Sequence, residues 1–241
     1  SRVHVTPELA DVTRPDAPTS KWQQPFDAEL TDVFQVQSEI ATKVAHALGA
    51  VLEAGEDERL FEKPTQNLAA YEAFLKGEAI RYRDFADTAG MRTALGFFEQ
   101  AVALDPGFAQ AWAGISATNS LLYSYSVPTP ALAERARQAA EKAVALAPNR
   151  SDVYMALGYY EQFVSKDVTR ALEHYEKGLR AAPRDAFLVK ATADAEAALG
   201  RWDAAAEHFR QAVRLDPRNA SNVWGLGEAL LVGARFRRDA H

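Results

Sequence analysis

Apolar residues recur at helical spacing in four segments that align with one another without gaps. These segments are FFEQAVALDP (97–106), AAEKAVALAP (139–148), HYEKGLRAAP (174–183) and HFRQAVRLDP (208–217). Each has the apolar stripe of an amphipathic helix and stops at a proline, which cannot continue a helix. The prolines are Pro106, Pro148, Pro183 and Pro217, at intervals of 42, 35 and 34 residues. The pattern predicts that one helical unit is repeated along the chain.

A second helical pattern begins three residues after each proline and completes the unit. It carries a bulky residue, a leucine and a glycine in order at Tyr154, Leu157 and Gly158. The same order returns at 223–227, whereas an earlier copy has Ser116 in place of the glycine. Each unit is therefore predicted to be a pair of helices joined by a short turn.

A unit of about 34 residues with W-x2-L-G, a later Ala, an aromatic residue, Ala and Pro resembles the tetratricopeptide (TPR) repeat. The resemblance covers residues 66–241 and implies a mainly α fold, a TPR α-α superhelix of about four full repeats and one truncated repeat. In the unit that ends at Pro217, we expect the small Ala193, Ala205 and Ala212 to let helices approach closely while Phe209 fills the gap between them.

The long intervals leave two interpretations open for the stretches 84–90 and 124–130. The added residues either lengthen both helices of each hairpin, since seven residues make about two helical turns, or form a loop surface for a partner. The side chains of such a surface would be Phe85, Tyr123, Tyr125 and Val127.

The last unit begins near Ala220, and Phe236 takes the place that Trp202 holds one repeat earlier. Its second helix is thus predicted to be incomplete, and we expect the natural protein to continue with more repeats. Trp224, Leu230 and Leu231 would then form an exposed apolar end that could support a homodimer.

The N-terminal residues follow a different pattern. Val3 and Val5 alternate with polar residues as in a half-buried strand, and a turn-rich stretch leads to a second strand at 21–26. Asp32 then starts a helix that should end near Leu52 to Gly55. Residues 1–62 are therefore predicted to be a short α/β segment, a β-hairpin plus one helix.

This segment resembles the end of a TolB-like α/β module that precedes TPR arrays in bacterial signalling proteins. The residues that carry the resemblance are Trp22, Phe26, Asp27, Asp32, Phe34, Gln37, Ile40, Ala41, Val44 and Leu48, followed by Pro64, Thr65, Asn67 and Tyr71. The resemblance implies a regulatory or sensory part of a larger protein whose upstream domain is a Ser/Thr kinase or a nucleotide cyclase. It leaves the compartment open between cytoplasmic and extracytoplasmic.

Composition narrows the classes of function. The 241 residues are 48% hydrophobic, enough for a packed core, and carry no cysteine. Disulfides and thiol chemistry are thereby excluded. The formal net charge is -6, which disfavours nucleic acid as a partner. The apolar stretches are shorter than the roughly 20 residues of a membrane helix, so a soluble chain without membrane insertion is expected.

A search for catalytic patterns favours a protein that is not an enzyme and needs no cofactor or metal. Phosphate-binding loops and the G-x-S-x-G motif do not occur. Among five histidines, His174 and His208 occupy equivalent places in successive repeats. A metal site built on this pair is one interpretation, but duplication of the repeat is favoured because no further ligand accompanies them.

The first helix of each TPR unit lines the concave side of the superhelix, which offers a groove for a protein or peptide. The predicted groove residues are Glu72, Lys76, Gln110, Asp152, Met155, Tyr159, Gln162, Lys190, Asp194, Trp224 and Glu228. The family's Lys/Asn clamp for a C-terminal carboxylate is not matched. Two functions stay open: a protein-protein interaction scaffold, and a structural spacer or homo-oligomerisation arm.

Overall fold

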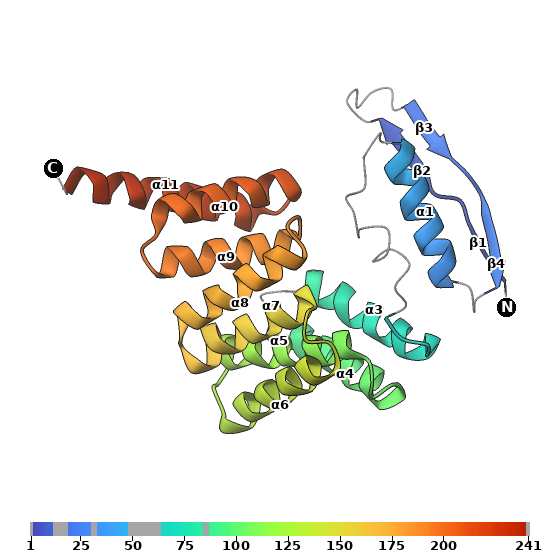
Figure 1. Cartoon of the computed structure of the whole chain (residues 1–241), viewed down its shortest axis with the longest axis horizontal. Helices are drawn as coiled ribbons and strands as arrows, with labels where there is room; N and C mark the ends of the chain where they lie inside the picture. Colours follow the sequence, from blue (N-terminus) through green and yellow to red (C-terminus); the bar gives the residue numbers. More distant parts are fainter. Residues whose placement is uncertain (1, 12–18, 30–32, 48–63, 84–86, 240–241) are drawn as a thin grey trace. The chain divides into compact units, whose positions relative to one another are not determined.

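The structure is a computed structural model that describes residues 2–11, 19–29, 33–47, 64–83 and 87–239 (Figure 1). Contacts divide the chain into two compact units, Ser1–Leu68 and Ala69–His241. The described part of the first unit contains strands and a helix, and that of the second unit contains helices.

The first unit contains an antiparallel hairpin whose two arms are each broken once. Strand β1 (Arg2–Val5) pairs with β4 (Phe26–Glu29), and β2 (Glu8–Asp11) pairs with β3 (Thr19–Gln23). Pro7 and Pro25 lie at the breaks, where a residue without an N–H cannot donate to the ladder.

One helix, α1 (Val33–Ala47), contacts β3 and β4. The Nζ atom of Lys43 lies 4.7 Å from the ring centroid of Phe26, the buried aromatic residue of β4. The predicted short α/β segment is confirmed over its described residues by the hairpin and α1, while the predicted helix end near Leu52 to Gly55 lies outside the described residues.

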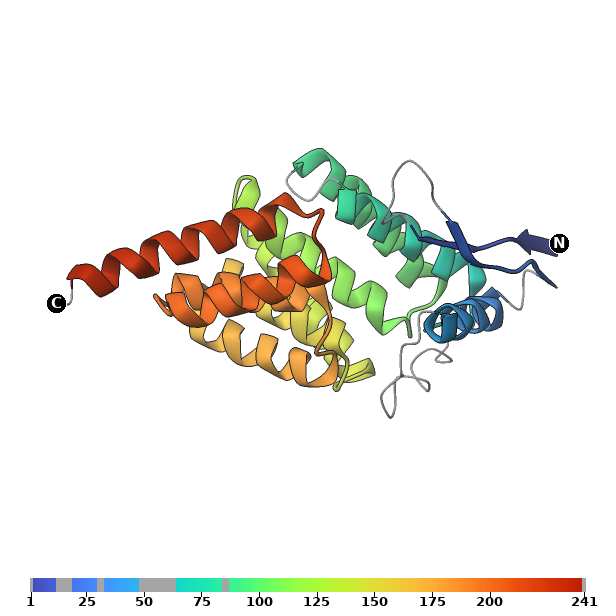
Figure 2. The same cartoon turned by 90° about the horizontal axis from the view of Figure 1, so that it is seen from above.

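The second unit is a stack of antiparallel helical hairpins (Figures 1 and 2). Its elements are α3 (Leu68–Arg83), α4 (Thr88–Leu104), α5 (Ala109–Tyr125), α6 (Pro130–Leu146), α7 (Ser151–Tyr159), the π-helical turn η2 (Tyr160–Ser165), α8 (Val168–Ala181), α9 (Ala186–Ala198), α10 (Trp202–Leu215) and α11 (Ala220–Asp239). The helices α4, α6, α8 and α10 end just before the four repeat prolines, and the next helix begins three residues after each proline, as the sequence predicts.

Small residues allow the paired helices to approach closely. Ala193, Ala205 and Ala212 are fully buried around Phe209, as expected for the unit that ends at Pro217. In the unit before it, a Cβ atom built on Gly158 would lie 2.1 Å from the Cε1 atom of Tyr175. The helix pair α7 and α8 therefore has room for no side chain at that position.

Helix length accounts for the extra residues of the second unit. Its helices α5 and α6 have 17 residues each, against 14 in α8 and α10. Val127 in the connecting turn is 76% exposed, and Tyr125 ends α5. Phe85, in the corresponding stretch of the first unit, lies outside the described residues.

The 35-residue interval between Pro148 and Pro183 corresponds to the π-helical turn η2. The turn ends at Lys166, which has a left-handed backbone with φ 62°, and the equivalent residue of the next repeat is Gly200 with φ 73°. Lys166 lies one residue farther from Pro148 than Gly200 lies from Pro183. A π turn accommodates one additional residue within a helix, so the extra residue is taken up between Gly158 and Lys166.

The prediction that a second helix begins near Phe236 is wrong. Helix α11 runs without a break from Ala220 to Asp239. At the place where Gly200 ends the previous first helix, this unit has Ala234. A left-handed backbone is costly for a residue with a Cβ atom, although Lys166 adopts one at the equivalent position of an earlier repeat, so Ala234 favours continuation of the helix without enforcing it.

Candidate functional site

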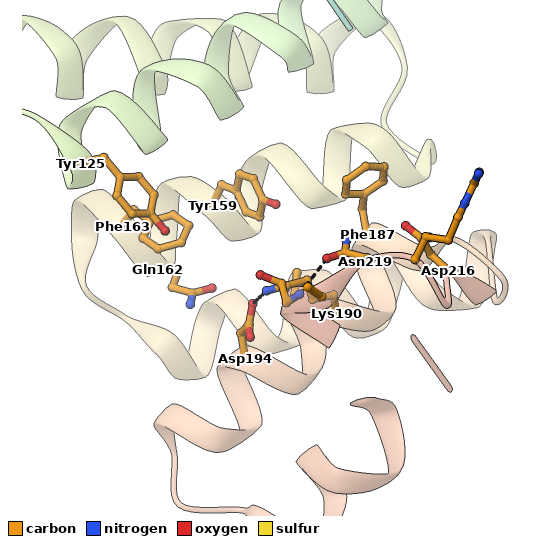
Figure 3. A pocket seen from close by; sticks show the side chains of 13 residues that line it. Tyr125, Tyr159, Gln162, Phe163, Phe187, Lys190, Asp194, Asp216 and Asn219 are labelled. Carbon is orange, nitrogen blue, oxygen red and sulfur yellow. Dashed lines mark hydrogen bonds and ion pairs between the residues drawn. The ribbon is translucent and has the colours of Figure 1, made fainter. Parts of the chain in front are cut away.

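Four predicted groove residues meet in a single pocket of the helical unit (Figure 3). Tyr159, Gln162, Lys190 and Asp194 come from α7, η2 and α9 and line a cavity of about 460 Å³. The remaining lining residues are Tyr125, Phe163, Phe187, Ala191, Asp216, Arg218, Asn219, Ala220 and Ser221. The pocket thus draws on the end of α5, on η2, on α9 and on the start of α11.

One side of the pocket is aromatic. The rings of Tyr159 and Phe163 meet edge to face, with centroids 5.5 Å apart and an angle of 74° between their planes. Tyr125, at the end of α5, is 49% exposed beside them. Gln162 is held in place because its Oε1 atom accepts a hydrogen bond of 2.7 Å from the hydroxyl of Tyr175. The π turn therefore brings both Gln162 and Phe163 to the pocket.

The other side is polar and comes mainly from α9. The Nζ atom of Lys190 donates to the Oδ2 atom of Asp194, one helical turn later, at 2.6 Å. Phe187 precedes them on the same face of α9. Asp185 caps the helix by accepting hydrogen bonds from the backbone N–H groups of residues 187 and 188, and this cap fixes where α9 begins.

The lining of the pocket carries two carboxylates, Asp194 and Asp216, and two cations, Lys190 and Arg218. Burial raises the pKa of Asp194, and the nearby Glu228 raises it further against the opposing effect of Lys190. Burial also raises the pKa of Tyr159 to about 12, with Arg81 opposing the shift. Tyr159 is therefore a neutral hydrogen-bonding group at physiological pH. The charge of the buried Asp194 carries a desolvation cost, and a nearby cation would reduce that cost.

An arginine of the first repeat contacts a ring of the pocket lining. Arg81 on α3 is 7% exposed and makes two hydrogen bonds, of 3.0 and 2.7 Å, to the carboxylate of Glu78. Its guanidinium carbon lies 5.8 Å from the ring centroid of Phe187 on α9. Sequence reasoning missed this residue, because the contact joins helices that are far apart in the chain.

Comparison with known proteins assigns the architecture. Residues 193–231 match the family model described as TPR repeat. The helical unit has the fold of a TPR superhelix. Among solved structures, a thermophilic TPR protein of Thermus thermophilus aligns with a TM-score of 0.54 and 16% identity over 82% of this chain and 99% of that chain. Pseudomonas aeruginosa pilF aligns with a TM-score of 0.51 and 16% identity over 70% of each chain. No curated protein matches the sequence. At these identities the likeness establishes the fold.

The other predicted groove residues of the TPR array lie away from this pocket. Glu72 and Lys76 form an exposed ion pair on α3 with a distance of 2.8 Å. Asp152 pairs with Arg150 at the start of α7, and Met155 is buried in the hydrophobic core. Gln110 is half-buried on α5.

Trp224 and Glu228 line a second, open depression on α11. One set of apolar residues on α11 is exposed, Val223 by 54%, Trp224 by 78%, Leu230 by 41% and Leu231 by 71%, while Leu226 is half-buried and Ala229 is buried. The predicted exposure of this end of the TPR array is confirmed. A Cβ atom on Gly227 would meet nothing within 4 Å, whereas the equivalent Gly158 faces the ring of Tyr175.

The histidines of the TPR array have separate environments. The Nδ1 atom of His208 lies 2.7 Å from the Oε2 atom of Glu196, and His174 is half-buried in α8. Within the described ranges, no group of three or more His, Asp or Glu residues could hold a metal ion. The same part of the chain has no helix that is long and apolar enough to cross a bilayer.

Proposed function

We propose that the TPR array is a non-enzymatic protein-binding module that takes a peptide segment of a partner in the pocket around Tyr159, Gln162, Lys190 and Asp194. The observation that carries the proposal is a cavity of about 460 Å³ whose walls come from α5, η2, α9 and α11. Solenoids of this kind use concave surfaces built from successive repeats for binding.

The chemistry of the walls suits a peptide. Binding sites combine apolar walls with a few polar groups that fix the orientation of the ligand. Here the rings of Tyr159 and Phe163 supply apolar surface, while Gln162, Lys190 and Asp194 supply donors and acceptors. One side chain can enter the pocket while the polar groups hold the neighbouring main chain.

The same proposal places the module in a larger bacterial signalling protein, as its regulatory or sensory part. Support comes from the N-terminal unit, in which a hairpin with Trp22 and Phe26 is followed by α1, the order of the TolB-like module it resembles. In this role the array would bring a partner protein to a catalytic domain elsewhere in the chain. The cellular compartment of the array would be the one in which that larger protein holds it.

Selection of binding peptides from a displayed library tests the groove. Enriched peptides are then measured against a variant that fills the pocket, Ser221→Trp, because Ser221 is an exposed pocket residue in the first turn of α11. The matched control is Ala131→Trp, an exposed first-turn residue of α6 outside the pocket. We expect a loss of affinity of roughly tenfold or more for Ser221→Trp and none for the control. Peptides that bind both variants equally would contradict the proposal.

A second function, a homo-oligomerisation arm or spacer, is favoured by the exposed apolar face of α11. Trp224 and Leu231 are 78% and 71% exposed. Large apolar side chains that are exposed together on one surface indicate an interaction site, whereas a single exposed apolar residue does not. Light scattering over a concentration series distinguishes the two functions. A dimer that Trp224→Ser dissociates, and that Val127→Ser at another exposed apolar residue leaves intact, would support the arm. A monomer at all concentrations would exclude it.

A further inference from the structure

We infer that the pocket selects a basic side chain of its partner, an arginine guanidinium held between the aromatic wall and the carboxylate of Asp194. The inference rests on the proposed function and specifies its ligand. It is argued from the arrangement of rings and charges in the pocket.

The first argument is the combination of ring faces with a carboxylate. Tyr125, Tyr159 and Phe163 line one side of the cavity and Asp194 the other (Figure 3). Cations are attracted to the faces of aromatic rings, and arginine most often, because its planar guanidinium stacks and is weakly hydrated. A guanidinium can at the same time donate hydrogen bonds to a carboxylate. A long basic side chain can meet both walls of this cavity.

The second argument is that the chain already places its own cations on an aromatic ring and on a carboxylate of the pocket lining. Lys190 contacts the Oδ2 atom of Asp194 at 2.6 Å. Arg81 packs on Phe187 with its guanidinium carbon 5.8 Å from the ring centroid. One ring and one carboxylate of the lining therefore already hold cations within the folded chain, and a partner's arginine would repeat chemistry that the protein itself uses.

The third argument is the balance of charge. Asp194 and Asp216 line the pocket, and Glu228 is close enough to raise the pKa of Asp194. The cations in the lining are Lys190 and Arg218. Arg81, behind Phe187, is neutralised by its two hydrogen bonds to Glu78. The two carboxylates and two cations of the lining balance, and Glu228 adds negative charge beside Asp194, which favours a cation at that wall.

Lys190 is also the group that a competing ligand would use. A partner carboxylate would pair with Lys190 and be repelled by Asp194, whereas an arginine would pair with Asp194 and be repelled by Lys190. The two ligand classes therefore predict opposite effects for the same substitutions. The affinity for an apolar side chain would change little when the charge of either Lys190 or Asp194 is removed.

The experiment is a nuclear magnetic resonance titration of isotope-labelled protein with peptides blocked at both ends, Gly-Ala-Gly-X-Gly-Ala-Gly. X is arginine, citrulline, leucine or glutamate, and citrulline keeps the shape of arginine without its charge. We expect the arginine peptide to bind roughly tenfold more tightly than the citrulline peptide. Ser221→Trp should remove the binding, and Ala131→Trp should preserve it.

Two variants test the direction of the charge effect. Asp194→Asn should weaken the arginine peptide roughly tenfold, and Lys190→Met should strengthen it about threefold or more. The control is Lys177→Met, which removes an exposed lysine of α8 outside the pocket and should have no effect. Equal affinity for the arginine and citrulline peptides overturns the inference without any variant.

The remaining outcomes separate this inference from the proposed function. Tighter binding of the leucine or glutamate peptide, removed by Ser221→Trp, overturns the inference and leaves the peptide-binding function standing. Binding of the glutamate peptide lost in Lys190→Met identifies an acidic ligand instead. No binding by any peptide at about 10 mM overturns the inference, and the library selection then decides the proposed function by itself.

Discussion

Replacing Gly158 by alanine tests whether the close approach of α7 and α8 stabilises the TPR array. A Cβ atom at this position would lie 2.1, 2.5 and 2.7 Å from the Cε1, Cδ1 and Cζ atoms of Tyr175. Tyr175 is fully buried, and its hydroxyl donates to Gln162. The added Cβ atom and the ring cannot both keep these positions, so either the ring or the two helices must shift.

The magnitude follows from opposing effects. Alanine in place of glycine inside a helix gains about 1 kcal/mol of helix propensity. Overpacking a buried site costs roughly 1–3 kcal/mol, and disturbing the hydrogen bond from Tyr175 to Gln162 costs about 1 kcal/mol more. Because the contact of 2.1 Å is far below van der Waals distance, the upper part of the range applies. We expect a net loss of about 2 kcal/mol, which lowers the melting midpoint by roughly 4–8 °C.

Circular dichroism during thermal and urea unfolding measures the change. Gly96→Ala on α4 is the matched control, since a Cβ atom there meets nothing within 4 Å, and it should stabilise the protein by about 1 kcal/mol. In the double variant Gly158→Ala/Tyr175→Leu, the smaller side chain should recover part of the loss. A Gly158→Ala protein as stable as Gly96→Ala would refute the reasoning.

Two further predictions concern the turn that follows η2 and the histidine of α10. Lys166→Gly should raise the unfolding free energy by about 1 kcal/mol, because Lys166 has φ 62° and glycine adopts this backbone without penalty; Gly200→Ala, at φ 73°, should lower it by a similar amount in the same urea titrations. The hydrogen bond to Glu196 raises the pKa of His208 above its ordinary value of 6.5, so its stabilisation is complete below that pH and is lost as the pH rises through the raised pKa. For this partly exposed pair, His208→Gln should therefore destabilise the protein by about 1 kcal/mol near pH 5.5 and have little effect near pH 9. Burial lowers the pKa of His174, so protonation of His174 destabilises the fold at low pH, and His174→Gln should make the protein more stable there than the unsubstituted protein. Equal effects of either substitution at both pH values would contradict this assignment.

Much of the fold was predictable because its determinants are local. The helical period of apolar residues, the prolines that stop each second helix and the small residues around Phe209 are all visible within single repeats. The structure places helix starts three residues after each proline and buries Ala193, Ala205 and Ala212. At the C-terminal end, where the prediction is wrong, Ala234 stands at the position of the glycine that ends the preceding first helix.

The candidate site was predictable in part. Tyr159, Gln162, Lys190 and Asp194 occupy first-helix positions that periodicity assigns to the groove, and they meet in the pocket. Tyr125 was named only as part of a possible loop surface, and Phe163 and the other lining residues were missed. The available signal was the interval of 35 residues, whose extra residue is taken up in a π turn at the pocket wall.

The sequence by itself determined the helical hairpins, the order of the repeats, the short α/β segment and the exposed apolar face of α11, because each depends on side-chain periodicity over one or two turns. The tertiary structure decided which residues converge. Tyr125 reaches the pocket from the end of α5, and Arg81 reaches Phe187 from another repeat. Such contacts depend on how small rotations between packed helices add up along the stack, and no single repeat encodes that sum.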